Sequence, residues 1–135
     1  MREPNARAYL VSEWLKHAAD DELNVKAILK DRDGTPAQIC FLSQQMGEKY
    51  LKALILYATG DYPKTHDLSQ LVVRAKRNIP TAEELKTETI LLDPYYVGTR
   101  YPADIAIEEL TWQDADDAFA AALRIKEFVL RIVHS

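Results

Sequence analysis

The sequence predicts an all-α protein, an up-and-down antiparallel helical bundle of about five helices, three of them long. Apolar residues recur every three to four positions over long stretches, which is the period of an amphipathic helix. Only four glycines and six prolines interrupt the 135 residues, and they fall where helices are expected to end. The chain has no β-hairpin turn signal and no internal repeat. At this length we expect residues 1–135 to form a single domain.

The first two helices are predicted from their apolar spacing and their end signals. Residues 6–30 carry apolar side chains at helical spacing, and a polar turn follows them. Thr35 then precedes Pro36, which indicates an N-cap with proline at the first helical position. We expect the second helix to continue to about Thr59 and to stop at Gly60.

Two shorter helices are expected next. The third should begin near residues 65–67 and run through Ala75. Thr81 and Glu84 have the spacing of a capping box, with Thr81 as the N-cap of a fourth helix that ends at 91–92.

One long irregular segment and a final helix complete the predicted bundle. Residues 93–110 hold two prolines, a glycine and three tyrosines, which is typical of a loop. Thr111 should cap a last helix that reaches about Val133 and is rich in alanine.

Composition limits the classes of function. The net charge of −4 argues against tight, non-specific binding along nucleic acid, which needs many cations against the phosphates. We expect a cytoplasmic protein, because neither a signal peptide nor an apolar run of membrane-spanning length is seen. Cys40 is the only cysteine, so it cannot form an internal disulfide, and its apolar neighbours indicate a small core residue. Neither metal-ligand spacing nor a glycine-rich phosphate loop occurs, so no metal and no cofactor is expected.

The second helix carries two different faces. At 100° per residue its core face is predicted to hold Ile39, Met46, Tyr50, Ala53, Leu54 and Tyr57. Another arc of roughly 100° holds Gln45, Glu48, Lys49 and Lys52. These four are either solvated surface residues, with Glu48 paired to Lys52 four positions on, or a polar cluster at a cleft or subunit interface. In the second case the lysines would meet an anion, oriented by Gln45 and Glu48.

Several motifs together resemble one known family. These are the run from Gln45 to Leu54 (QMGEKYLKAL), the block KTHDL at 64–68, and Arg100-Tyr101-Pro102. Trp14, Ala18 and Asp21 in the first helix and the alanine-rich last helix fit the same pattern. In this order and separation the motifs resemble the HEPN domain (higher eukaryotes and prokaryotes nucleotide-binding) over nearly the whole chain.

The resemblance implies a fold, partners and two kinds of activity. HEPN domains are antiparallel helical bundles that commonly dimerise, and they are similar to the C-terminal helical domain of kanamycin nucleotidyltransferase. Stand-alone prokaryotic members are often encoded beside a minimal nucleotidyltransferase in a toxin–antitoxin-like pair. Some members are metal-independent ribonucleases whose arginine is followed by a histidine about four to six residues later. This chain lacks that local motif, because no histidine follows Arg100 at such a distance.

His66 and Arg100 are the candidate catalytic residues. Imidazole titrates near neutral pH, so His66 could act as an acid or base if the fold brings Arg100 to it. Alternatively, Asp67 or Thr65 caps the third helix and His66 fills the turn. Arg100 could contact a phosphate, and the tyrosines of this segment, Tyr101 among them, could stack on a base. Alternatively, the tyrosines pack the loop onto the bundle, and Arg100 pairs with a carboxylate such as Asp67 or Glu48.

Three hypotheses follow. The first is a HEPN protein that binds a nucleotide or RNA, or regulates a nucleotidyltransferase, through ligand-binding residues among Gln45, Glu48, Lys49, Lys52, Asp67 and Tyr101. The second is a ribonuclease that uses His66 and Arg100. The third is a non-catalytic homodimeric interaction module. Two acidic steps, one at Asp20, Asp21 and Glu22 and the other at Asp114, Asp116 and Asp117, are expected to be mostly solvated.

Overall fold

The computed structural model describes residues 4–96 and 109–134, and within these it is an all-helical up-and-down bundle. The helices are α1 (Pro4–Asp31), α2 (Pro36–Thr59), α3 (Leu68–Lys76), α4 (Lys86–Leu92) and α5 (Trp112–Val133). Two short 3-10 helices, η1 (Pro80–Leu85) and η2 (Asp93–Tyr95), flank α4. The predicted fold class is confirmed, with three long helices. The predicted sites at Arg100 and Tyr101 lie outside the described residues.

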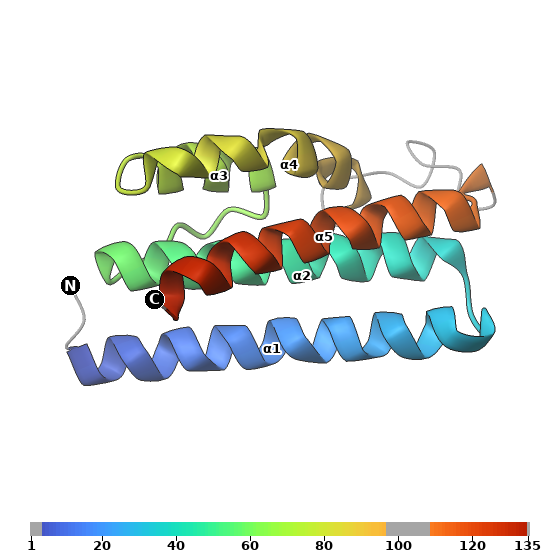
Figure 1. Cartoon of the computed structure of the whole chain (residues 1–135), viewed down its shortest axis with the longest axis horizontal. Coiled ribbons are helices and arrows are strands. Elements are labelled where there is room, and N and C mark those ends of the chain that lie inside the picture. Colours follow the sequence, from blue (N-terminus) through green and yellow to red (C-terminus); the bar gives the residue numbers. More distant parts are fainter. Residues whose placement is uncertain (1–3, 97–108, 135) are drawn as a thin grey trace.

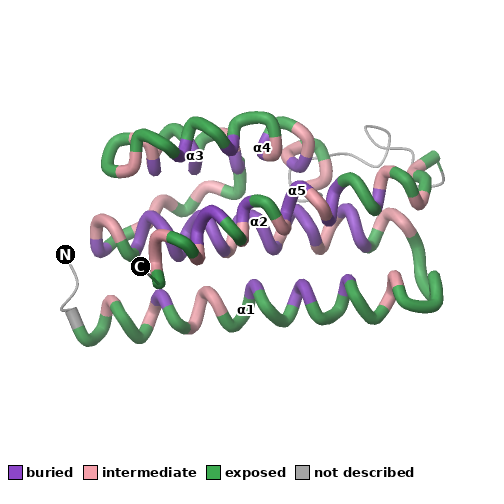
Figure 2. Tube along the Cα trace, in the orientation of Figure 1, coloured by how far each residue is buried: buried purple, intermediate pink, exposed green. Residues whose placement is uncertain are grey.

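Helix α2 is the central element of the bundle. It packs against α1 on one side and α5 on another, while α3 and α4 form a shorter layer beside it (Figure 1). Figure 2 shows that α2 is buried along most of its length, whereas α1 has a continuous exposed face. None of the helices in the described part of the chain is long and apolar enough to cross a membrane.

Local capping interactions fix the long helices where the sequence predicts them. The Thr35 side chain accepts a hydrogen bond from the Gln38 backbone N–H, and Pro36 occupies the first turn of α2. Gly60 ends α2 with φ of 85°, a left-handed conformation that glycine adopts without strain. Thr111 and Asp114 form a reciprocal capping box at the start of α5.

The predicted capping box at Thr81 and Glu84 is wrong. Ile79 is the residue that directly precedes the helical turn, and Pro80 starts the 3-10 helix η1 without a side-chain cap. Thr81 therefore lies inside a helical turn, and a residue there cannot be an N-cap because its backbone is already helical. Helix α4 begins later than predicted, at Lys86.

The core contains most of the residues predicted for it. Five of the six apolar positions predicted on α2 are buried, but Tyr57 keeps 39% of its surface exposed because it lies at the end of α2, beside an open groove. Cys40 is buried as predicted, and burial raises the pKa of its thiol to about 11. Gly47 lets α2 lie close to its neighbours, since a Cβ there would be 3.2 Å from Cδ1 of Ile125.

Two acidic residues of α1 contradict the prediction that they are solvated. Asp21 and Glu22 are each only 8% exposed. Asp21 accepts a hydrogen bond from Lys49 Nζ at 2.6 Å, and Glu22 pairs with Lys26 and Lys126, both at 2.7 Å. Each carboxylate is compensated by lysines, two of them from other helices, which is how buried charge is accommodated.

Candidate functional site

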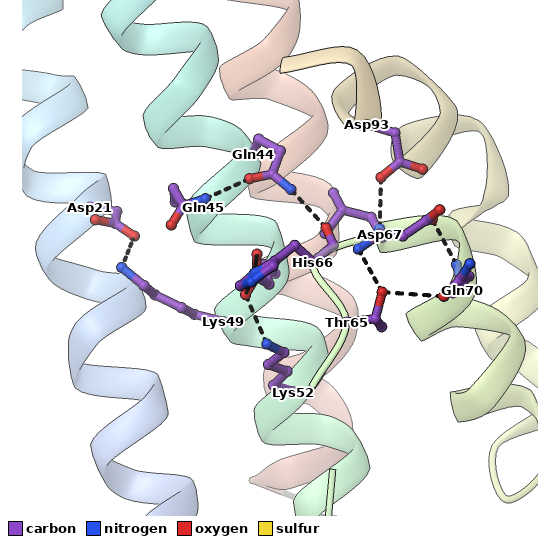
Figure 3. A network of polar contacts seen from close by, with 12 residues as sticks. Asp21, Gln44, Gln45, Lys49, Lys52, Thr65, His66, Asp67, Gln70 and Asp93 are labelled. Carbon is purple, nitrogen blue, oxygen red and sulfur yellow. Dashed lines mark hydrogen bonds and ion pairs between the residues drawn. The ribbon is translucent and has the colours of Figure 1, made fainter. Parts of the chain in front are cut away.

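A band of polar side chains crosses α2 from α1 to α3 (Figure 3). At its centre, Glu48 and Lys52 are 6% and 4% exposed, and Lys52 Nζ donates to Glu48 Oε2 over 2.9 Å. The predicted i,i+4 pair therefore exists, but it is buried and not at the surface. A buried ion pair needs further partners for its remaining hydrogen-bonding positions.

Two aromatic rings surround the Lys52 ammonium. Its Nζ lies 5.6 Å from the ring centroid of Trp14 on α1 and 5.9 Å from that of Tyr62, which follows α2. The two rings pack edge to face, with centroids 5.2 Å apart. Both distances are within the range of cation–π attraction, so the ammonium is stabilised on the sides that Glu48 does not reach.

His66 completes the cluster. Its Nδ1 lies 3.1 Å from Glu48 Oε1 and 3.0 Å from Oε2, while 48% of its side chain remains exposed. The imidazole stacks on Tyr96, with centroids 4.6 Å apart and planes at 14°. His66 is thus fixed at Nδ1 by the Glu48 carboxylate and along one face of the imidazole by the Tyr96 ring.

Backbone contacts fix the segment that carries His66. Gln44 is fully buried, and its Nε2 donates to the backbone carbonyl of His66 at 3.1 Å. Gln45 Nε2 in turn donates to Gln44 Oε1 at 2.8 Å. Gln44 was not predicted as a site residue, although it directly precedes Gln45, which was. Gln45 therefore supports the position of His66 through Gln44.

The start of α3 is capped twice beside His66. Asp67 accepts a hydrogen bond from the Gln70 backbone N–H at 3.0 Å, as the capping interpretation predicts. Asp93, from η2, accepts from the backbone N–H groups of Leu68 and Ser69. Burial raises the pKa of the Asp93 carboxyl, although these donors oppose the shift. Asp93 was also not predicted, because it precedes Pro94 in a segment interpreted as a loop.

A pocket of about 300 Å³ opens beside His66. Its wall consists of Lys64, Thr65, His66, Asp67, Asp93 and Tyr96. The pocket therefore combines a stacked aromatic pair, one ammonium and two carboxylates. Among the residues that the structure describes, no group of three metal-ligating side chains comes together.

The predicted polar arc of α2 divides into two parts. Glu48 and Lys52 point into the cluster with His66, whereas Lys49 turns the other way and pairs with Asp21 on α1 (Figure 3). The structure thus places Glu48 beside His66, which lines the pocket together with Asp67, whereas Lys49 pairs with α1. The pairing of His66 with Arg100 is untested, since Arg100 is outside the described residues.

The fold and this cluster together define a class: a helical bundle in which a charged pair on the second helix holds a histidine from the following connection. The chain belongs to the HEPN domain family, whose model matches residues 11–132.

Two solved structures support this assignment. TT1696 from Thermus thermophilus is 30% identical, with a TM-score of 0.77 over 90% of this chain and 96% of that one. ST0689, an archaeal HEPN homologue, is 29% identical, with a TM-score of 0.74 over 91% of this chain and 97% of that one. No curated protein sequence matches the chain significantly.

The buried pair gives a prediction about stability. Lys52→Met should lower the free energy of unfolding by about 3–5 kcal/mol, because it leaves the Glu48 carboxylate buried without its ammonium. Urea denaturation followed by tryptophan fluorescence measures this loss. Lys49→Met is the matched control and should cost less, because the Lys49 side chain is 24% exposed whereas that of Lys52 is 5% exposed, so water partly screens the Lys49 ion pair. Equal losses in the two variants would contradict the prediction.

Proposed function

We propose that this protein binds a nucleotide or the end of an RNA in the pocket beside His66, and that this binding regulates a partner minimal nucleotidyltransferase. The observation that carries the proposal is the half-exposed His66, fixed by the buried Glu48 and stacked on Tyr96. An immobilised ring pair at a pocket mouth is a surface on which a base can stack.

The polar groups of the pocket suit one nucleotide better than an extended strand. Lys64 can meet a phosphate, and the carboxylate of Asp67 can accept hydrogen bonds from the amino groups of a base. A pocket of about 300 Å³ is at the small end of ligand sites. The overall charge of −4 also disfavours a long phosphate backbone.

The remaining candidate residues take different parts in this proposal. Glu48 and Lys52 position His66, Gln45 supports the site through Gln44, and Arg100 and Tyr101 remain candidates for contact with the ligand. Lys49 pairs with Asp21 and does not line the pocket, so we propose it as a contact for the partner nucleotidyltransferase. We place the protein in the cytoplasm, where these ligands occur, and propose that its helices act as one domain around a shared core.

Calorimetric titration with AMP, ATP, GTP and a short single-stranded RNA tests the proposal. His66→Ala should weaken binding at least tenfold, because the stacking surface is lost. His17→Ala replaces another exposed histidine, on α1, and should bind like the unaltered protein. The proposal fails if none of the four ligands binds at millimolar concentration, or if the two variants bind equally.

A second candidate is a metal-independent ribonuclease. It is favoured by the Glu48 contact to Nδ1, which leaves Nε2 of His66 directed away from its carboxylate and available as a base. A histidine oriented by a buried carboxylate is the arrangement used in general acid–base catalysis.

Cleavage of a labelled RNA in the presence of EDTA tests this candidate. His66→Ala and Arg100→Ala should each abolish cleavage, while Arg77→Ala, an exposed arginine at the end of α3, should leave it intact. Absence of cleavage by the unaltered protein eliminates the candidate without affecting the binding proposal.

We also propose that the protein forms a homodimer through α1. A groove of about 990 Å³ runs between α1 and the ends of α2 and α5, and its apolar wall includes Val11, Leu15, Tyr57 and Val133. The small side chain of Ala19 borders it and permits close approach of another helix.

Charge favours a second copy as the occupant of this groove. Among the residues that the structure describes, the lining contains Arg7 and Lys16 but no carboxylate, whereas Asp20 is exposed on the same helix. Two α1 helices related by a two-fold axis perpendicular to them are antiparallel, and in that arrangement the basic half of each would lie beside the acidic residue of the other.

Light scattering tests the dimer. The unaltered protein should have twice the monomer mass, and Ala19→Glu should shift it to the monomer because it places a carboxylate at the wall of the groove. Ala27→Glu adds the same charge at an exposed position of α1 outside the groove and should remain dimeric. A monomeric unaltered protein, or equal masses for both variants, would refute this interface.

A further inference from the structure

We propose that Lys52 is a positioning residue for His66: by holding the Glu48 carboxylate in its charged form, it fixes the tautomer of His66 and presents Nε2 to the pocket as a hydrogen-bond acceptor. The effect of Lys52 on a bound ligand rests on the proposed function. The effect of Lys52 on the His66 tautomer does not, because it is present without a ligand.

Lys52 does not reach the pocket. Its side chain is 5% exposed, its Nζ is bonded to Glu48, and the rings of Trp14 and Tyr62 lie beside it. None of the side chains lining the pocket is Lys52. A ligand in the pocket therefore meets His66, and Lys52 acts on that ligand only through Glu48.

The hydrogen bonds fix which ring nitrogen of His66 carries the proton. An ionised carboxylate only accepts, so Nδ1 must donate its N–H to Glu48, whose two oxygens lie 3.1 and 3.0 Å away. In the neutral ring the other nitrogen, Nε2, then carries no hydrogen and accepts a hydrogen bond. Glu48 Oε2 is shared between His66 and Lys52, so the ammonium and the imidazole compete for one charged group.

Loss of the ammonium charge would reverse this arrangement. A carboxylate that is 6% exposed and unpaired favours uptake of a proton from solvent. The Glu48–His66 pair then holds two protons, one in the hydrogen bond between Glu48 and Nδ1 and the other on Nε2. The pocket would gain a donor where it had an acceptor, although no residue lining the pocket had changed.

Lys49 provides the matched comparison. It is the neighbouring lysine on the same helix and also bonds a buried carboxylate, but that carboxylate is Asp21, and none of the described contacts joins this pair to His66. A general effect of removing one lysine charge from α2 would appear in both variants. An effect carried by Glu48 appears only when Lys52 is changed.

The ¹⁵N chemical shifts of the His66 imidazole, recorded at pH 8 without ligand, test the inference. The unaltered protein and Lys49→Met should show the Nδ1–H tautomer, and Lys52→Met and Lys52→Gln should shift toward Nε2–H. Lys52→Arg keeps the charge and should restore the Nδ1–H form. An Nε2–H tautomer in the unaltered protein, or unchanged shifts in a folded neutral variant, overturns the proposal. If both neutral variants fail to fold, Lys52→Arg decides: a changed tautomer refutes the proposal and a retained one supports it.

Titration with AMP separates this inference from the proposed function. If Lys52 controls the tautomer, and AMP binds to the unaltered, Lys49→Met and Lys52→Arg proteins but not to Lys52→Met or Lys52→Gln, both stand. Failure of AMP to bind while the tautomer follows Lys52 removes the nucleotide site and leaves the positioning role. AMP binding that is lost in His66→Ala, together with a tautomer independent of Lys52, removes the positioning role alone.

Discussion

The rest of the site depends on the compensation of one buried charge, the carboxylate of Glu48 in the middle of α2. A carboxylate that water hardly reaches must be paired and hydrogen-bonded, or it loses its charge. Here the compensation comes from two directions: Lys52, one turn further along the same helix, and His66, eighteen positions later in the connection to α3. Because Glu48 needs a second partner, the connection between α2 and α3 is held against α2 through His66, and the pocket is fixed with it.

The same helix also brings the core and the site close together. Gly47 directly precedes Glu48, and the absence of its side chain lets residues of α3, α4 and α5 approach α2. Leu68, the first residue of α3, is one of these neighbours, and it follows His66 by only two positions. Close packing at Gly47 thus helps to place the segment that carries His66 beside α2.

The fold could be predicted from the sequence because its main signals are local. Thr35 and Thr111 cap their helices through backbone groups three positions away, and both helix starts are as predicted. The predicted N-cap at Thr81 is wrong because the helical turn already begins at Pro80. The spacing of Thr81 and Glu84 does not reveal that earlier start. The Glu48–Lys52 pair was also a local prediction. Its burial was not, because it depends on the aromatic residue Trp14 from another helix.

The parts of the site that sequence reasoning missed are long-range contacts. Asp21 and Glu22 resemble a solvated acidic step, yet their lysine partners include Lys49 and Lys126, 28 and 104 positions away. Asp93 likewise caps a helix that begins 25 positions earlier. Helical periodicity assigns each of these residues to a face of its own helix, but only the packed bundle determines what that face meets.

The two lysines of α2 show most clearly how the packed bundle separates residues that helical periodicity groups together. Lys49 and Lys52 are three positions apart and lie within one arc of the helix, so the sequence assigns them the same role. In the bundle, α1 supplies a carboxylate to the first and an aromatic ring to the second, since Asp21 and Trp14 are separated by two turns. Lys49 therefore joins two helices, whereas Lys52 is left to pair with a residue of its own helix. Because that residue also bonds His66, only one of two chemically identical side chains is coupled to the pocket.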